Sequence, residues 1–113
     1  MIKLFVSIPP KYQMTKEEID KFTARYEEIA HEVECRLEKY CELYYTLDGL
    51  VCSDIEAGRK GYMFDQFSDL KDADCAVFAD GWKSSEECVR LHKIVELLGI
   101  RILDFDDKEG ETS

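Results

Sequence analysis

The clearest pattern of apolar and polar positions lies between Ala73 and Phe105. The run Ala73–Ala79 is largely apolar and too short for an isolated helix, which is typical of a strand buried on both faces. Ile100–Phe105 is a similar run, and it predicts a second strand. Between the two runs, apolar residues recur every three or four positions, as on one face of a helix: Cys88, Leu91, Val95 and Leu98. Together these residues predict two parallel strands joined by a right-handed helical crossover.

The ends of this helix also carry recognisable signals. Ser84 followed by Glu87 has the spacing of a capping box, in which each side chain binds the other residue's backbone N–H. Gly99 can adopt the left-handed conformation that ends many helices. The sequence therefore predicts a helix that begins after Ser84 and ends before Gly99.

The first part of the chain predicts another strand followed by a long helix. Ile2–Ile8 is a short hydrophobic run that Pro9 and Pro10 interrupt. Thr15 and Glu18 form a second capping box. The helix that it begins has an apolar face with a spacing of three or four residues: Ile19, Phe22, Tyr26, Ile29, Val33 and Leu37.

The middle of the chain has a weaker pattern. Leu43–Leu47 is rich in tyrosine and in residues that favour strands, which predicts an edge strand with Asp48 and Gly49 in the following turn. Residues 49–61 show no clear period, and Gly58–Gly61 is expected to be a flexible connection that could act as a lid. The apolar positions from Tyr62 onward predict a helix that ends near residue 72.

The alternation of strands and helices predicts an α/β fold: a small doubly wound, Rossmann-like or flavodoxin-like parallel sheet of about four strands, with helices on both faces. The simplest strand order is 2-1-3-4, in which the chain changes direction between the first and third strands. Ligands bind at such a position, outside the carboxyl ends of the strands, where Ser7–Pro10 and Ala79–Ser85 are expected to meet. Residues 1–105 are predicted to form one domain, and residues 106–113 a disordered acidic tail.

Composition excludes several classes of function. A net charge of −10 over 113 residues argues against direct binding of nucleic acid or anionic membranes, although a helix N-terminus can still hold a small anion. No apolar run approaches the roughly 18 residues that would span a membrane, and Ile2–Ile8 lacks a basic leader, so a cytoplasmic protein is expected. The 5 cysteines include no Cys-x-x-Cys pair, which predicts reduced thiols and no metal site.

Familiar catalytic motifs are absent from the sequence. No Gly-x-Gly-x-x-Gly or Walker lysine follows the first strand, and no Gly-x-Ser-x-Gly elbow is present, so no dinucleotide cofactor is expected. Of the 2 histidines, His31 lies among polar positions and is predicted at the surface. His92 lies beside the apolar stripe of its helix, where partial burial and packing are favoured over catalysis.

Several short motifs resemble the nucleoside 2-deoxyribosyltransferase-like superfamily, and particularly its short members from phages and bacteria. The resemblance covers most of residues 2–105. The residues that carry it are Leu4–Pro9, Ala73-Asp74, Gly81-Trp82, and Cys88 with His92 ahead of Gly99-Ile100. Members with this activity cleave the bond between base and deoxyribose through a glutamate nucleophile, which traps the sugar as a glycosyl-enzyme.

The chain departs from this family at two positions. Leu91 stands where the resemblance places the nucleophile, and the nearest acids are Glu86 and Glu87. Glu87 has the alternative role of a capping residue. Gln66 stands where the transferases have a substrate-binding aspartate, although the neighbouring Asp65 could replace it.

Three functions are consistent with these residues. The favoured one is a nucleoside- or nucleotide-binding protein without glycosyl transfer, which senses or sequesters its ligand. The second is an active deoxyribosyltransferase or N-glycosidase that uses Glu87 or Glu86, assisted by Asp65 or His92. The third is an acidic inhibitor from a mobile genetic element that acts on a basic protein partner. The expected ligand-binding residues are Ser7, Pro9, Gln66, Asp80, Gly81, Trp82, Ser84, Ser85, Leu91 and His92.

Two of these assignments have structural alternatives of equal or greater weight. Trp82 could stack on a ligand or anchor its loop in the core, and Asp80 fits a plain turn better than a ligand contact. The tyrosines of the second strand and the family resemblance also make a homodimer an expectation, with the pocket completed by a neighbouring subunit.

Overall fold

The structure, a computed structural model, describes residues 1–103. Its strands are β1 (Ile2–Ser7), β2 (Cys41–Tyr44), β3 (Cys75–Phe78) and β4 (Arg101–Leu103), its helices are α1 (Lys16–Leu37), α2 (Ile55–Leu70) and α3 (Glu86–Leu98), and its short 3-10 turns are η1 (Asp48–Val51) and η2 (Trp82–Ser84). The predicted acidic tail, residues 106–113, lies outside the described part of the chain. None of these helices is long and apolar enough to cross a membrane.

The sheet has the predicted topology. Its four strands are all parallel and follow the order β2-β1-β3-β4, with Val6 of β1 paired with Val77 of β3. The backbone N–H of Ala79 donates to the carbonyl of Ser7 at 2.9 Å, so the exits of β1 and β3 run side by side. The chain therefore changes direction between these two strands, as the sequence indicates.

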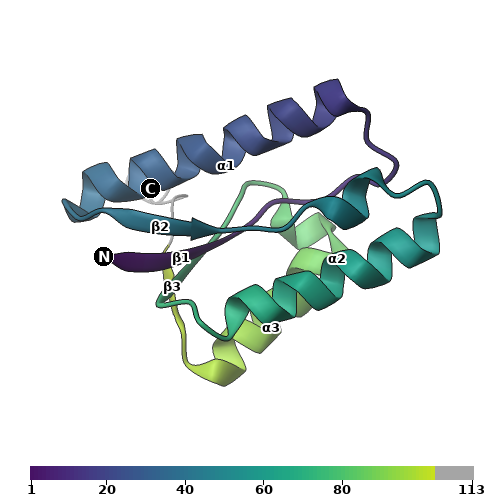
Figure 1. Cartoon of the computed structure of the whole chain (residues 1–113). Helices are drawn as coiled ribbons and strands as arrows, with labels where there is room; N and C mark the ends of the chain where they lie inside the picture. The colour runs from purple at the N-terminus through teal and green to yellow at the C-terminus, as the bar shows by residue number, and fades with distance from the viewer. Residues whose placement is uncertain (104–113) are drawn as a thin grey trace.

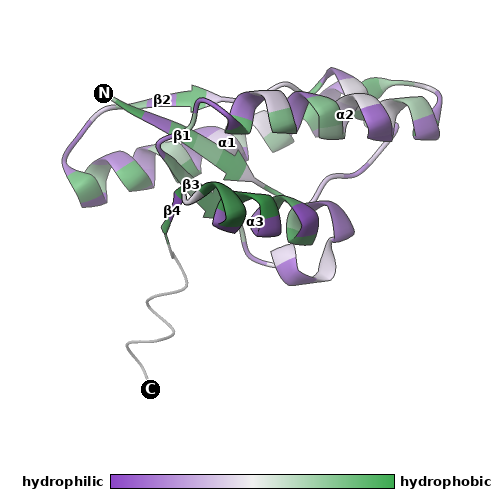
Figure 2. Ribbon diagram, turned by 90° about the horizontal axis from the view of Figure 1, so that it is seen from below, coloured by the Kyte–Doolittle hydropathy of each residue, from purple (hydrophilic) through white to green (hydrophobic). Residues whose placement is uncertain are grey.

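Helices cover both faces of the sheet. In Figure 1, α1 lies on one side, and α2 and α3 lie on the other. Figure 2 views the molecule from the α2 and α3 side and shows hydrophobic residues along β1. Alternate residues of β1 serve the two faces: Val6 joins the cluster that contains Phe22 of α1, whereas Phe5 joins the cluster that contains Leu91 of α3. A parallel sheet covered in this way is an α/β fold.

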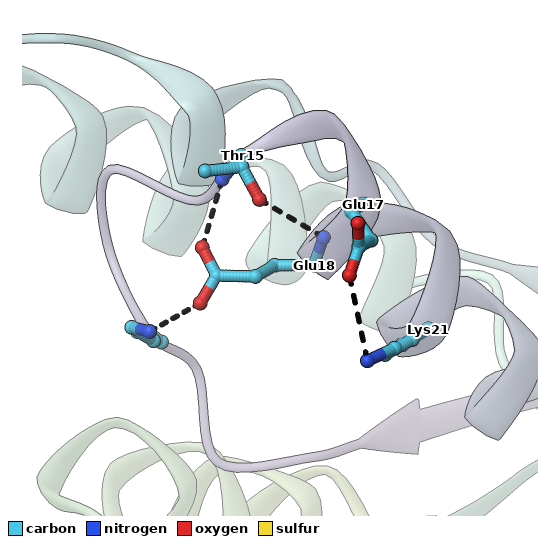
Figure 3. Close-up of polar contacts among 5 residues, drawn as sticks. Thr15, Glu17, Glu18 and Lys21 are labelled. Atoms are coloured by element: carbon cyan, nitrogen blue, oxygen red, sulfur yellow. Dashed lines mark hydrogen bonds and ion pairs between the residues drawn. The ribbon is translucent and has the colours of Figure 1, made fainter.

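The predicted capping box at the start of α1 is confirmed. The Thr15 hydroxyl accepts from the Glu18 N–H at 3.1 Å, and the Glu18 carboxylate accepts from the Thr15 N–H at 2.9 Å. Figure 3 shows this reciprocal pair and the neighbouring ion pair between Glu17 and Lys21. The ammonium of Lys11 also pairs with Glu18 and, with the Thr15 N–H, lowers the pKa of Glu18 to about 2. The N-terminal end of α1 is thus fixed by local sequence.

Two element boundaries in the middle of the chain differ from the prediction. Strand β2 spans residues 41–44 instead of 43–47, because the chain leaves the sheet before Tyr45. The Tyr45 ring stacks on the Tyr26 ring of α1, with 4.9 Å between the ring centroids. The carbonyl of the next residue, Thr46, accepts from the Gln66 side chain of α2 at 3.4 Å. Contacts with α1 and α2 therefore replace the strand pairing that the sequence predicts for residues 45–47.

Helix α2 begins at Ile55, seven residues before the predicted start, so the expected lid at residues 58–61 is wrong. The Asp54 carboxylate caps the helix by accepting from the N–H groups of Glu56 and Ala57. Gly58 lies inside this helix. A glycine is required there because a Cβ would lie 2.3 Å from the carbonyl oxygen of Gly49. The glycine thus marks a close backbone approach between α2 and η1 instead of a loop.

The N-terminus of α3 also differs by one residue. Ser85, and not Ser84, is the N-cap, and its hydroxyl accepts from the Cys88 N–H at 3.3 Å. Ser84 belongs to η2, so the predicted Ser84–Glu87 capping box does not form. The other end matches the prediction, because Gly99 ends the helix in the left-handed conformation with a φ of 73°. The five cysteines are free thiols, as expected.

Candidate functional site

Four polar residues meet beyond the carboxyl ends of β1 and β3, and we refer to Tyr12, Arg59, Ser85 and Glu87 as the Glu87 cluster. The Tyr12 hydroxyl donates to Glu87 Oε2 at 2.6 Å, and Arg59 Nε lies 3.7 Å from the same oxygen. The Ser85 hydroxyl donates to Glu87 Oε1 at 3.4 Å. The loop after β1, helix α2 and helix α3 all contribute to this cluster. Glu87 is therefore held by tertiary contacts and has no part in the predicted capping box.

The loop between β1 and α1 positions Tyr12 over this region. The loop is fixed at its far end, where the Met14 N–H donates to the Leu50 carbonyl at 2.8 Å and the Gln13 side chain donates to the Ser53 carbonyl at 2.8 Å. Burial, and then the adjacent Glu87 carboxylate, raise the pKa of Tyr12 well above its usual range, although Arg59 opposes part of this shift. Tyr12 consequently remains a hydrogen-bond donor at neutral pH.

Behind the Glu87 cluster lies a second polar group, the buried hydroxyl cluster, formed by Ser7, Tyr26, Tyr62 and Cys88. All four are buried, and the Ser7 hydroxyl donates to Cys88 Sγ at 3.1 Å. Burial raises the pKa of both Tyr26 and Tyr62, and their hydroxyls lie close enough to interact by a weak hydrogen bond with each other. Within residues 1–103, neither hydroxyl makes a hydrogen bond of normal geometry.

The two hydroxyls lack a hydrogen bond of normal geometry, which carries an energetic cost. A buried polar group wholly without a partner destabilises a fold by about 1–3 kcal/mol, and the interaction between the two hydroxyls offsets part of this cost. The edge of the Tyr62 ring packs against Tyr12, with 6.4 Å between ring centroids. The buried hydroxyl cluster therefore adjoins the Glu87 cluster.

A third group, the aromatic stack of Phe78, Trp82 and His92, lies at the exit of β3. The Trp82 and His92 rings are stacked, with 4.3 Å between centroids and 7° between planes. Phe78 contacts both rings, at 5.5 Å from Trp82 and 4.8 Å from His92. Trp82 is partly buried and packs against Phe78 and His92, a packing that fits the expected role of loop anchor; its expected role as a stacking surface for a ligand stays a prediction. His92 is partly buried within this packing, as the sequence indicates.

Leu91 and Gln66, the two positions at which the chain departs from the resembled family, are both fully buried. Leu91 lies in the core cluster with Phe5, Leu70 and Val95, so no carboxylate occupies this position. The Gln66 side-chain nitrogen bonds to Thr46 as described above. Its Oε1 has no hydrogen-bond partner among the described residues.

The remaining predicted residues lie mostly at the surface. Asp80, Gly81 and Ser84 are exposed on the loop between β3 and α3, and Pro9 is partly buried after β1. Glu86 points into solvent with 69% of its side chain exposed, and pairs with Arg90 at 3.3 Å along the same helix. Among the acids considered as nucleophiles, Glu87 belongs to the cluster at the strand ends and Glu86 does not. His31 is exposed, as predicted.

The sequence patterns did not identify Tyr12 or Arg59 as site residues. Tyr12 follows a strand in an irregular loop, and it meets Glu87 across 75 positions of sequence, which no local pattern reveals. Arg59 lies in residues 58–61, which the sequence predicts to be a flexible connection and which belong to α2 in the structure. Recognition of Asp54 as an N-cap would have extended α2 and placed Arg59 on a helix, but not beside Glu87.

A shallow hollow of about 380 Å³ lies elsewhere, at the C-terminal end of α1. Its lining residues are His31, Glu34, Cys35, Glu38, Lys39 and Tyr40. The polar groups there belong mainly to one helix and the residues that follow it, and they do not converge on a common point. Among residues 1–103, no group of three or more His, Cys, Asp and Glu side chains could hold a metal ion.

Comparison with known proteins adds no further constraint. Protein families, curated proteins and solved structures give no match to this chain. The candidate site therefore rests on its position at the reversal of strand order and on the geometry of the Glu87 cluster and the buried hydroxyl cluster.

Proposed function

We propose that the protein binds a nucleoside or nucleotide at the carboxyl ends of β1 and β3, and that it does so without glycosyl transfer. One observation carries the proposal: polar side chains from a loop and two helices converge at the reversal of strand order, where Tyr12, Arg59 and Ser85 contact the carboxylate of Glu87. This position is where doubly wound sheets bind ligands.

The chemistry of the site suits a ligand with several hydroxyl and amide groups. The Glu87 carboxylate accepts hydrogen bonds, Arg59 donates them, and the hydroxyls of Tyr12 and Ser85 can do either. The Arg59 guanidinium lies over the Tyr12 ring, with 5.5 Å between Arg59 Cζ and the ring centroid. Resemblance to nucleoside 2-deoxyribosyltransferases supports a base linked to a sugar as the ligand class.

The absence of glycosyl transfer is inferred from Leu91. The resemblance places the catalytic nucleophile at this position, and a leucine cannot form a glycosyl-enzyme. Its side chain lies wholly in the core beside Phe5 and Val95, so no small movement would bring another group into its place.

A second candidate function, hydrolysis of the N-glycosidic bond, is favoured by the position of Glu87. This carboxylate has no capping role, lies at the strand ends and is hydrogen-bonded to Tyr12, so it could attack a sugar carbon. Against this function, Oε2 is engaged by both Tyr12 and Arg59, which reduces its strength as a nucleophile.

Measurements of ligand binding and of base release separate the two functions. The protein would be titrated with a panel of nucleosides and nucleoside 5′-monophosphates by calorimetry, and the same mixtures would be analysed for free base by chromatography. We expect binding without release of base. Release by the parent that is lost in Glu87→Gln, but kept in Glu86→Gln, would instead establish hydrolysis. Failure of every compound to bind would refute the nucleoside proposal.

A further inference from the structure

His31 and Cys35 bring two metal-ligating atoms together near the end of α1. The residues are four positions apart, so they share one face of the helix, and Nε2 of His31 lies 3.6 Å from Sγ of Cys35. In a tetrahedral zinc site, a sulfur at about 2.3 Å and a nitrogen at about 2.0 Å from the metal lie about 3.5 Å from each other. The pair therefore already has the separation that a zinc ion requires of two of its ligands.

The surroundings of this pair favour a cation. Both side chains are exposed, and they line the shallow hollow at the end of α1 together with Glu34 and Glu38. The last carbonyl groups of α1 have no partner within the helix and carry partial negative charge. Lys39, which also lines the hollow, opposes only part of this negative potential. A divalent cation at the pair would therefore be attracted by two carboxylates and by the helix end.

One chain supplies only part of a zinc site. Within residues 1–103, no group of three or more His, Cys, Asp and Glu side chains could hold a metal ion. The carboxylate of Glu34 is already held at the start of β2, where Oε2 accepts from the Cys41 N–H at 2.9 Å. A structural zinc ion takes four ligands, so two would have to come from outside the chain. A two-fold axis through the metal would supply the same pair from a second copy.

We propose that His31 and Cys35 form half of a zinc site, which two copies of the chain complete around one ion. Zinc accepts a tetrahedral set of two thiolates and two imidazoles. Bonds to the metal replace the weak contact between the two side chains, and each thiol releases its proton to solvent. Two chains of net charge −10 repel each other, so the dimer should form only when the metal is bound.

The zinc site is separate from the proposed ligand site. Helix α1 ends where β2 begins, so the hollow lies at the amino ends of the strands, whereas the Glu87 cluster lies at their carboxyl ends (Figure 1). The absence of a Cys-x-x-Cys pair predicts no metal site from the sequence. A histidine and a cysteine four residues apart become neighbours only once they lie on a helix. The inference therefore does not depend on the proposed function.

Cobalt(II), a spectroscopic substitute for zinc, tests the proposal on the full chain with its thiols kept reduced. The parent is expected to bind one ion per two chains, with the thiolate-to-cobalt absorption of a tetrahedral site, and to change from monomer to dimer in sedimentation. A zinc titration by calorimetry should give the same stoichiometry. Cys35→Ser and His31→Ala should each weaken zinc binding by more than about tenfold, because loss of a ligand costs at least as much as loss of a group that orients one. Both variants should stay monomeric when the metal is added.

Two control variants separate this pair from nonspecific binding. Cys52→Ser removes another thiol that is only partly buried, and Glu32→Gln removes a carboxylate on the same helix that pairs with Arg36 at 3.3 Å. Both should leave zinc affinity within about twofold of the parent, because charges exposed to water interact weakly. Equal losses in Cys52→Ser and Cys35→Ser would overturn the proposal, and so would no zinc binding by the parent or a monomeric complex with one ion per chain. The side chains of His31 and Cys35 are exposed, so their variants should keep the parent's melting temperature without metal.

Discussion

Two regions around the first turns of α3 differ in how completely their groups are satisfied. The aromatic stack of Phe78, Trp82 and His92 is closed, with rings packed face to face or at a tilt. The Glu87 cluster and the buried hydroxyl cluster behind it are polar, and the Tyr26 and Tyr62 hydroxyls interact with each other without a hydrogen bond of normal geometry among the described residues. Both regions lie at strand ends, but only the second retains unused hydrogen-bonding capacity.

This difference separates the residues that stabilise the fold from those suited to bind a ligand. Aromatic pairs contribute about 0.5–1.5 kcal/mol each beyond the area they bury, and they require nothing else. The carboxylate, guanidinium and hydroxyls of the Glu87 cluster contribute less to stability than apolar packing, and their position at the strand ends favours a role in binding. Trp82 and His92 accordingly belong to the first group, and Tyr12, Arg59 and Glu87 to the second.

The largest expected effect is at Leu91, in the core that both regions share. Leu91→Ala should destabilise the protein by about 2–5 kcal/mol, the usual cost of such a cavity. Leu91→Glu should cost more, because an unpaired carboxylate in an apolar site must be desolvated or take up a proton. Urea unfolding of both variants measures the difference. A Leu91→Glu protein as stable as the parent would show that this position opens onto the ligand site and not into the core.

Trp82→Ala tests the aromatic stack next. Loss of the two ring pairs that Trp82 makes with Phe78 and His92 should cost about 1–3 kcal/mol, whereas affinity for the ligand should change little. Trp82→Phe is the matched control and should recover part of the stability. Loss of binding in a Trp82→Ala protein that remains folded would move Trp82 into the site and erase the contrast between the two regions.

Tyr62→Phe tests the other region and has the smallest expected effect on stability. Removal of the Tyr62 hydroxyl should leave the free energy of unfolding within about 1 kcal/mol of the parent, because its interaction with the Tyr26 hydroxyl lacks the geometry of a normal hydrogen bond. Affinity for the ligand should fall at the same time. A substantial loss of stability, measured by thermal unfolding, would show instead that the hydroxyl is satisfied in the folded protein.

Much of the fold was predictable because it depends on local patterns. The apolar runs of β1 and β3, the period of α1 and the capping box at Thr15 are all encoded within a few residues, and the observed strand order is the simplest one for four parallel strands joined by helices. The errors at β2 and α2 arise from contacts between distant segments. Gly58 carries the local signal of a loop, but the glycine is required by the close approach of Gly49, which lies nine residues earlier and has no local sequence signal.

The candidate site was predictable only in position. The reversal of strand order indicates which strand ends meet. One of them is the end of β3, whose loop leads into α3 and so to Glu87. The partners of Glu87 could not be inferred in the same way, since Tyr12 and Arg59 come from other elements and carry no motif. Ser85 replaced Ser84 as the N-cap for a similar reason, because the η2 turn that precedes it has no clear sequence signal.

The central claim is that the ligand binds at the Glu87 cluster and not at the aromatic stack, and one spectrum can test it. Trp82 is the only tryptophan, so its indole N–H gives a single reporter for the aromatic stack in a ¹H–¹⁵N correlation spectrum. Titration with nucleosides and nucleoside 5′-monophosphates should shift the amides of Tyr12, Arg59 and Glu87 and leave the indole signal in place. Shifts of the indole signal without shifts at these three amides would contradict the account.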